Sequence, residues 1–283
     1  MDQVIACIDG SAIAISVCDA GAWASQRLKA PLTLLHALER TEFEAQANLS
    51  GNIGLGSREH LLEKLTELDA QRSRLALEHG KHMLDDAEER ASEDGAIGIT
   101  KLQRHGDLLE TLVSLEQNAR VFVMGRSGES HPISAHTVGN HIESVVRGLH
   151  RPILITVQEF HEPESFMLAY DGSETAQLAL AKVAKTPLLQ GLPCHLVLVG
   201  KQTEENTQML EQAQRTLQQA DIEVTAALIP GEVQPALCDY QKQHNIGLLV
   251  MGAYGHSRIR QFFIGSNTTR MISMSDAPLL LLR

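Results

Sequence analysis

The chain lacks the features that mark membrane proteins and nucleic-acid-binding proteins. No apolar run in its 283 residues approaches the roughly 18 residues that a membrane-spanning helix needs. The strand-like run from Val4 to Ile8 is not preceded by a basic and apolar signal segment. The net charge of −11 argues against a general affinity for nucleic acid or for an anionic membrane surface. We therefore expect a cytoplasmic protein that binds neither.

Cysteine is scarce, and the motifs of several enzyme classes are missing. The four cysteines show no C-x-x-C spacing, and Cys7, Cys194 and Cys238 each lie in an apolar run, as reduced core thiols do. The chain has no Walker A loop and no H-E-x-x-H metal motif. We therefore assign no catalytic residue and no metal ligand. We expect no covalently bound cofactor and at most slow, incidental ATP hydrolysis.

What the chain does contain is an internal repeat. The segment from Val4 to Ser11 reappears from Phe166 to Ser173, 162 residues later, and the next apolar run keeps this offset. Further along, the offset falls to about 126 residues, which locates about 36 additional residues in the first repeat. The sequence therefore predicts two domains, residues 1–158 and 165–283, with an insertion at about 41–76 in the first.

Each repeat contains five short apolar runs separated by helical patterns, which is typical of α/β folds with parallel sheets. In the second repeat we expect strands at 166–171, 194–199, 223–229, 247–252 and 278–282, and helices near 173–188, 204–220, 233–244 and 265–275. Ser11 and Ser173 follow the first strand of each repeat and lie outside any G-x-S-x-G motif, so we interpret both as helix N-caps. The predicted class is α/β, with two tandem Rossmann-like domains.

The additional residues of the first repeat combine a glycine-rich segment, 49–56, with a charged stretch of helical leucine spacing, 58–93. This pattern predicts a long second helix preceded by a loop. The loop could cover a ligand, and a surface connection is the alternative.

A glycine frame follows the fourth predicted strand of the second repeat. It reads Gly252-x-x-Gly255, then nine residues, then Gly265-Ser266. Glycines let the backbone approach a ligand closely, and the amides at the start of a helix attract anions. Parallel sheets bind phosphates at this position, beyond the carboxyl end of a strand. The frame therefore predicts a phosphate site.

The order of these motifs resembles the universal stress protein family, in particular its tandem, UspE-like members, over nearly the whole chain. The resemblance implies adenine-nucleotide α-hydrolase-like domains. Each would contain a five-stranded parallel sheet in the order 3-2-1-4-5 with helices on both faces, and the domains would pair through their fifth strands as a pseudo-dimer. It also implies a role in the stress response, ATP as the ligand, possible accompanying Mg²⁺, and a further homodimer of whole chains. Seven residues would contact the nucleotide: Asp171 and Val199 beside the adenine and ribose, Gly252 by the ribose, and Gly255, Gly265, Ser266 and Asn267 at the phosphates.

The first repeat departs from this pattern. Its matching residues are Asp9, Gly125, Gly128, Gly139 and Asn140. Ten residues instead of nine precede Gly139, and Asn140 stands where the family has a hydroxyl residue. We therefore expect the second domain to hold the principal nucleotide site and the first domain a weak or vestigial one.

Two classes of function remain open. The leading interpretation is a cytoplasmic stress protein that binds adenine nucleotide mainly in its second domain. The alternative is a non-enzymatic interaction scaffold with vestigial nucleotide sites and unknown protein partners. The intact second frame favours nucleotide binding, whereas the altered first frame favours the scaffold.

Overall fold

The computed structural model describes residues 2–38, 55–128, 140–253 and 266–283, with side chains described in these ranges except at 55–62, 140–141 and 266–267. Strands and helices of the first repeat alternate as predicted. Their bounds are β1 Gln3–Cys7, α1 Ala14–Leu28, β2 Leu32–Leu38, α2 Leu55–Glu93, β3 Thr100–His105, α3 Leu108–Leu115, the 3-10 turn η1 Glu116–Asn118, β4 Ala119–Gly125, α4 Asn140–Gly148 and β5 Ile153–Thr156.

The second repeat follows the same order with shorter connections. Its elements are β6 Phe166–Ala169, α5 Glu174–Val183, the 3-10 turn η2 Pro187–Leu189, β7 Cys194–Val199, α6 Glu204–Gln218, β8 Val224–Ile229, α7 Val233–Gln243, β9 Leu248–Gly252, α8 Ser266–Met274 and β10 Leu279–Leu282. Of the helices in the described ranges, none combines the length and the apolar character that crossing a bilayer demands.

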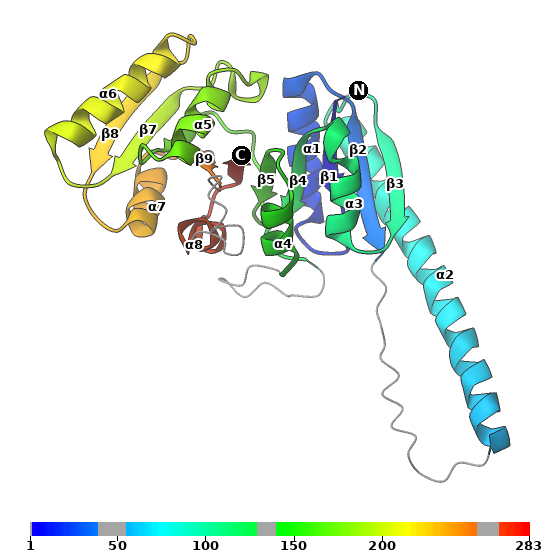
Figure 1. The fold of residues 1–283 in the computed structure, drawn as a ribbon. Helices are drawn as coiled ribbons and strands as arrows, with labels where there is room; N and C mark the ends of the chain where they lie inside the picture. The colour runs from blue at the N-terminus through cyan, green and yellow to red at the C-terminus, as the bar shows by residue number, and fades with distance from the viewer. Residues whose placement is uncertain (1, 39–54, 129–139, 254–265) are drawn as a thin grey trace.

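All ten strands belong to one sheet, in the order β3-β2-β1-β4-β5-β10-β9-β6-β7-β8 (Figure 1). The predicted order 3-2-1-4-5 is thus confirmed in each repeat. Neighbouring strands within a repeat are parallel, whereas β5 and β10 pair antiparallel, with Leu154 opposite Leu280. The predicted pairing of the repeats through their fifth strands is confirmed.

Apolar side chains cover both faces of this sheet, because successive residues of a strand point to opposite sides. In β1, Val4 and Ala6 join one buried cluster with α1 and α2, while Ile5 joins another with α3 and α4. The second repeat divides in the same way, with α5 and α6 on the first cluster and α7 and α8 on the second. Both clusters therefore run across the boundary between the repeats.

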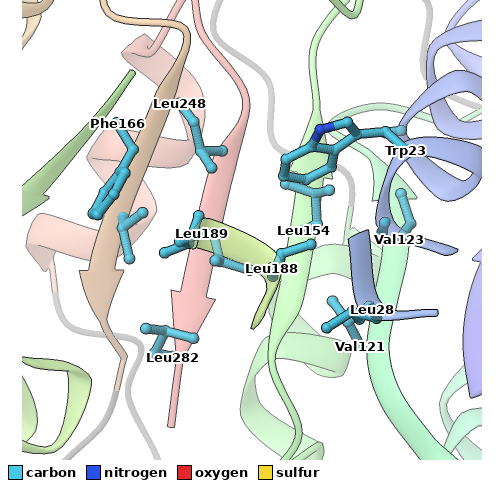
Figure 2. Close-up of a cluster of buried hydrophobic side chains, with 14 of the residues drawn as sticks. Trp23, Leu28, Val121, Val123, Leu154, Phe166, Leu188, Leu189, Leu248 and Leu282 are labelled. Carbon is cyan, nitrogen blue, oxygen red and sulfur yellow. The ribbon is translucent and has the colours of Figure 1, made fainter. Parts of the chain in front are cut away.

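Side chains also join the repeats along the face that carries α1. The rings of Trp23 and Phe160 lie 5.7 Å apart, and Phe160 belongs to the connection between β5 and β6. Figure 2 shows Leu188 and Leu189 of η2 between the strands of the second repeat and the first-repeat residue Leu154. The guanidinium of Arg27 donates to the carbonyl of Leu188 at 3.1 Å and also to that of Gln190.

The long helix predicted for the first repeat is confirmed as α2. Its C-terminal half buries one face, including Gly80, Leu84, Ala87 and Ala91, whose spacing is that of a helix packed on one side. The N-terminal half projects away from the sheet (Figure 1), and there Leu68 is 49% exposed. The predicted preceding loop lies largely outside the described residues.

For the first helix of each repeat, one predicted N-cap is confirmed, whereas the other N-cap and one predicted helix end need correction. Ser173 caps α5 as predicted, since its Oγ accepts from the amide of Ala176 at 3.3 Å. Ser11 does not cap α1: its hydroxyl donates to Asp9 Oδ1 at 2.5 Å, and the helix begins at Ala14. The predicted helix at 173–188 ends at Val183, because Pro187 disfavours helical backbone in the residue before it.

A small aromatic cluster lies between β7 and α7. Nδ1 of His195 lies 3.1 Å from the Tyr240 hydroxyl, and the ring of His244 lies 5.2 Å from that of His195. Burial lowers the pKa of His195 below its ordinary value, and the nearby His244 adds to this effect. The folded protein therefore favours the neutral form of His195.

The fully buried Leu154 tests how much the continuous cluster contributes to stability. Leu154→Ala should lower the free energy of unfolding by about 2–5 kcal/mol, because it removes apolar contacts and leaves a cavity. Leu178→Ala on α5, where the leucine is 39% exposed, should cost less than about 1 kcal/mol. Urea denaturation measures both, and equal losses would contradict a core that continues through β5.

The pH dependence of stability tests the aromatic cluster. The pKa of His195 is lower in the folded chain than its ordinary value of about 6.5, which applies in the unfolded chain. As the pH falls through this ordinary value, the unfolded chain therefore binds more protons than the folded chain. The free energy of unfolding should therefore fall as the pH drops from 7 to 5, and His195→Gln should flatten this slope. Urea denaturation of the wild type and of His195→Gln at pH 5, 6 and 7 measures the slope, and equal slopes for the two proteins would contradict this account.

Candidate functional sites at the carboxyl ends of the strands

In the first repeat the structure brings three of the predicted residues together. Asp9 follows β1, and its Oδ1 accepts from the amide of Ser11 at 3.1 Å. A Cβ placed on Gly128 would lie 3.1 Å from Asp9 Oδ2, so the turn after β4 passes directly over this carboxylate. Gly125, at the end of β4, packs against Ile13, where a Cβ would come within 2.9 Å of Cγ2.

In the second repeat Asp171 follows β6, and its Oδ1 accepts from the amide of Ser173 at 3.0 Å. Gly172 in this turn has a φ of 71°, a left-handed conformation that glycine adopts without strain. Val199 ends β7 and Gly252 ends β9, the strands on either side of β6. In open parallel sheets, ligands usually bind beyond the carboxyl ends of the strands, at the point where the strand order reverses. The carboxyl ends of β6, β7 and β9 lie next to this point.

Close packing against α5 requires glycine at position 252, whether or not a ligand binds there. A Cβ at this position would lie 2.5 Å from the carbonyl oxygen of Thr175 in the first turn of α5. That oxygen belongs to the backbone, so it cannot rotate away as a side chain can. The close approach of β9 to α5 therefore needs glycine here.

The remaining predicted residues are only partly described. Gly139, Gly255 and Gly265 lie outside the described residues. Asn140 is the first residue of α4, while Ser266 and Asn267 open α8, and the side chains of these three are not described. Each glycine frame is therefore followed by a helix.

A cavity of about 310 Å³ lies beside the first-repeat turn, and no sequence motif pointed to it. It is lined by Asp9 and Ser11 of the turn, by Cys18 of α1, and by Met83 and Arg90 of α2. Arg90 is held by Asp19, with 2.9 Å between Nη2 and Oδ2. The cavity thus opens between the two helices and depends on the long α2, whose helical leucine pattern was the only signal for it.

The thiols of this repeat are poor nucleophiles. Burial raises the pKa of Cys7 to about 12, and the nearby Asp9 adds to the rise. Burial also raises the pKa of Cys18 to about 12. Since the thiolate is the reactive form, both thiols are unreactive at neutral pH.

Arg126, between the two first-repeat glycines, makes a contact that sequence reasoning missed. Its Nη1 donates to the carbonyl of Ser275 at 2.6 Å, so the side chain reaches from the first repeat to the end of α8 in the second. Burial lowers the pKa of Arg126 from its ordinary value, and the carboxylate of Asp276 opposes this shift. The feature of the sequence that could have indicated this contact is the position of Arg126 between Gly125 and Gly128.

Comparisons with known proteins agree with the fold. A profile described as the universal stress protein family matches residues 1–156 and 164–283. Universal stress protein Slr1230 from Synechocystis sp. (strain ATCC 27184 / PCC 6803 / Kazusa) is 32% identical over 290 residues, covering 100% of both chains. A universal stress protein from Archaeoglobus fulgidus DSM 4304 has a TM-score of 0.71 at 16% identity, covering 99% of this chain and 98% of that one. The functionally unknown protein PA1789 from Pseudomonas aeruginosa PAO1 has a TM-score of 0.63 at 11% identity, covering 100% and 92%.

The different neighbours of Gly252 and Gly125 make a testable contrast. Gly252→Ala should lower the free energy of unfolding by about 1–3 kcal/mol, because the new methyl group meets the backbone of Thr175. Gly125→Ala should cost less, because the closest atom belongs to the Ile13 side chain. Chemical denaturation measures both, and a larger loss for Gly125→Ala would show that the two turns are packed differently from this description.

Proposed function

Because this chain belongs to the universal stress protein family along nearly its whole length, we propose that it binds adenine nucleotide, chiefly in the second repeat, with ATP as the ligand. In this proposal it acts in the cytoplasm in the response to stress. The observation that carries it is the intact glycine frame from Gly252 to Ser266. The frame begins at the end of β9 and finishes at the first residue of α8.

The chemistry of this frame suits a triphosphate. Backbone amides of a glycine turn and of the first turn of a helix hold phosphate oxygens without a large positive charge. A local site of this kind is what a chain with a net charge of −11 needs in order to bind an anion. In the proposed complex, Asp171 accepts from the ribose, Val199 lies beside the adenine, and any Mg²⁺ arrives with ATP.

The first repeat is a weaker candidate for the same ligand. There ten residues instead of nine separate Gly128 from Gly139, and Asn140 stands where the second repeat has the hydroxyl residue Ser266. Glu129, which follows Gly128 in the sequence, adds a negative charge. Negative side chains beside a phosphate position oppose anion binding through Coulomb repulsion.

We assign the chain no rapid hydrolysis. Neither glycine frame is accompanied by a nucleophile paired with a base, the arrangement that nucleophilic catalysis needs. The buried thiols of Cys7 and Cys18 have a raised pKa and do not fill this role. Binding, rather than turnover, is the proposed activity, and a further homodimer of whole chains is part of the proposal.

The scaffold alternative is favoured by one observation, the projecting half of α2. In this half and in the turn that follows it, the exposed Leu68, Leu75 and Leu77 offer apolar surface to a protein partner. Such a surface would function without any nucleotide. The two hypotheses therefore differ in whether the purified chain binds ATP.

Equilibrium binding of ATP with Mg²⁺ to two variants tests the placement of the site. Gly265→Val should abolish the main binding event, because a branched side chain blocks the approach of phosphate to the backbone. Gly139→Val makes the matched change in the first repeat and should leave this event within about twofold of the wild type. Titration calorimetry measures both, and loss of the main site only in Gly139→Val would overturn the assignment.

Two further results decide between the hypotheses. Mass spectrometry of the denatured, freshly purified protein should detect co-purified ATP. If the folded wild-type chain fails to bind ATP at millimolar concentrations, the scaffold becomes the better description.

A further inference from the structure

The hydrogen bond from Arg126 to Ser275 connects the turn of one predicted nucleotide site to the helix of the other. Arg126 follows Gly125, the last residue of β4, and its own amide donates to Thr156 of β5 at 3.0 Å. The backbone at the start of the side chain is therefore fixed to the sheet. From this anchored position the guanidinium reaches the end of α8, with 2.6 Å between Nη1 and the Ser275 carbonyl oxygen.

The contact is charge-assisted and lies at a favourable end of the helix. The last carbonyls of a helix have no partner within the helix and carry partial negative charge, which a nearby cation stabilises. The amide of Ser275 bonds to Met271 at 2.9 Å, so Ser275 continues the last turn of α8. Arg126 thus supplies to its carbonyl a donor that α8 itself lacks.

In the described residues, the glycine turn of the second repeat makes no equivalent contact. Gly252 matches Gly125, so Ala253 occupies the position of Arg126, and Leu149 matches Ser275 in the first repeat. Both Ala253 and Leu149 are fully buried in the same apolar cluster. A second-repeat arginine does reach the first repeat, since Nη1 of Arg283 donates to the carbonyl of Arg147 in the last turn of α4 at 3.3 Å. Among the described residues, the link that starts in a glycine turn runs only from the altered first frame to the helix of the intact second frame.

The geometry of α8 carries the effect to its other end. The helix has nine residues, from Ser266 to Met274, and spans about 14 Å at 1.5 Å per residue. Hydrogen bonds between residues four apart link the successive turns of a helix, so we expect a displacement of Ser275 to be passed to the turn that begins at Ser266. That turn follows Gly265 and supplies amides to the proposed phosphate site.

We infer that Arg126 is a positioning residue for the nucleotide site of the second repeat. By holding the carbonyl of Ser275, it fixes α8 in the orientation that binds phosphate, so the glycine turn of the first repeat sets the affinity of the second. This inference rests on the proposed function. It gives the altered first frame a role that does not require it to bind nucleotide.

Three variants of the full chain test the inference by ATP binding. Arg126→Met removes the donors and should weaken binding about tenfold, within the usual range for coupling between sites. Arg126→Lys retains a charged donor and should recover most of the affinity. Arg27→Met is the matched control, because Arg27 also bonds across the boundary but contacts η2, and its affinity should stay within about twofold of the wild type.

Amide hydrogen exchange of the nucleotide-free protein provides a readout that does not depend on the ligand. In Arg126→Met, exchange should accelerate in α8 and remain unchanged in α4, whereas a general loss of stability would accelerate both. Unchanged exchange in α8, or equal weakening of ATP binding by Arg27→Met, would overturn the inference. If the wild type binds no ATP while exchange in α8 responds to Arg126→Met, the proposed function fails, and the positioning of α8 by Arg126 is still supported.

Discussion

The antiparallel pairing of β5 with β10 is the constraint on which the rest of the molecule depends. Both strands are buried along their whole length, so neither could serve as the exposed edge of a separate five-stranded sheet. Pairing them converts two sheets into one and satisfies their backbone groups. It also aligns the helical layers, so that each apolar cluster continues from one repeat into the other.

The two repeats share one sheet but differ physically. The helix after the second strand has 39 residues in the first repeat and 15 in the second. Gly125 of the first repeat packs against the side chain of Ile13, whereas its counterpart Gly252 packs against the backbone of Thr175 in α5. Two identical subunits related by a twofold axis must present the same residues to each other. A tandem chain is free of this restriction, and the contact of Arg126 with α8 depends on that freedom.

The strands themselves could be predicted from periodic apolar runs and from the internal repeat, whereas their order and the pairing of the fifth strands were what the resemblance to the universal stress protein family implied. The predicted cap at Ser11 was wrong because α1 begins only at Ala14, which places Ile13 rather than Ser11 at the N-cap position. The contact of Arg126 with Ser275 joins residues 149 positions apart and depends on how the repeats meet, which no local pattern contains. The cavity between α1 and α2 depends in the same way on the packing of the insertion. For the candidate site, the sequence placed Gly252 and Asp171 at the ends of strands, but the close approach of Thr175 required coordinates.

The connection between β5 and β6 is short, running from Thr156 to Phe166, and Phe160 within it packs on Trp23. Separate subunits joined by the same strand pairing would obey mass action and come apart on dilution. A covalent tether makes their association intramolecular, with an effective concentration in the millimolar range for short linkers. The paired arrangement of the two repeats is therefore independent of how many copies of the chain a cell contains.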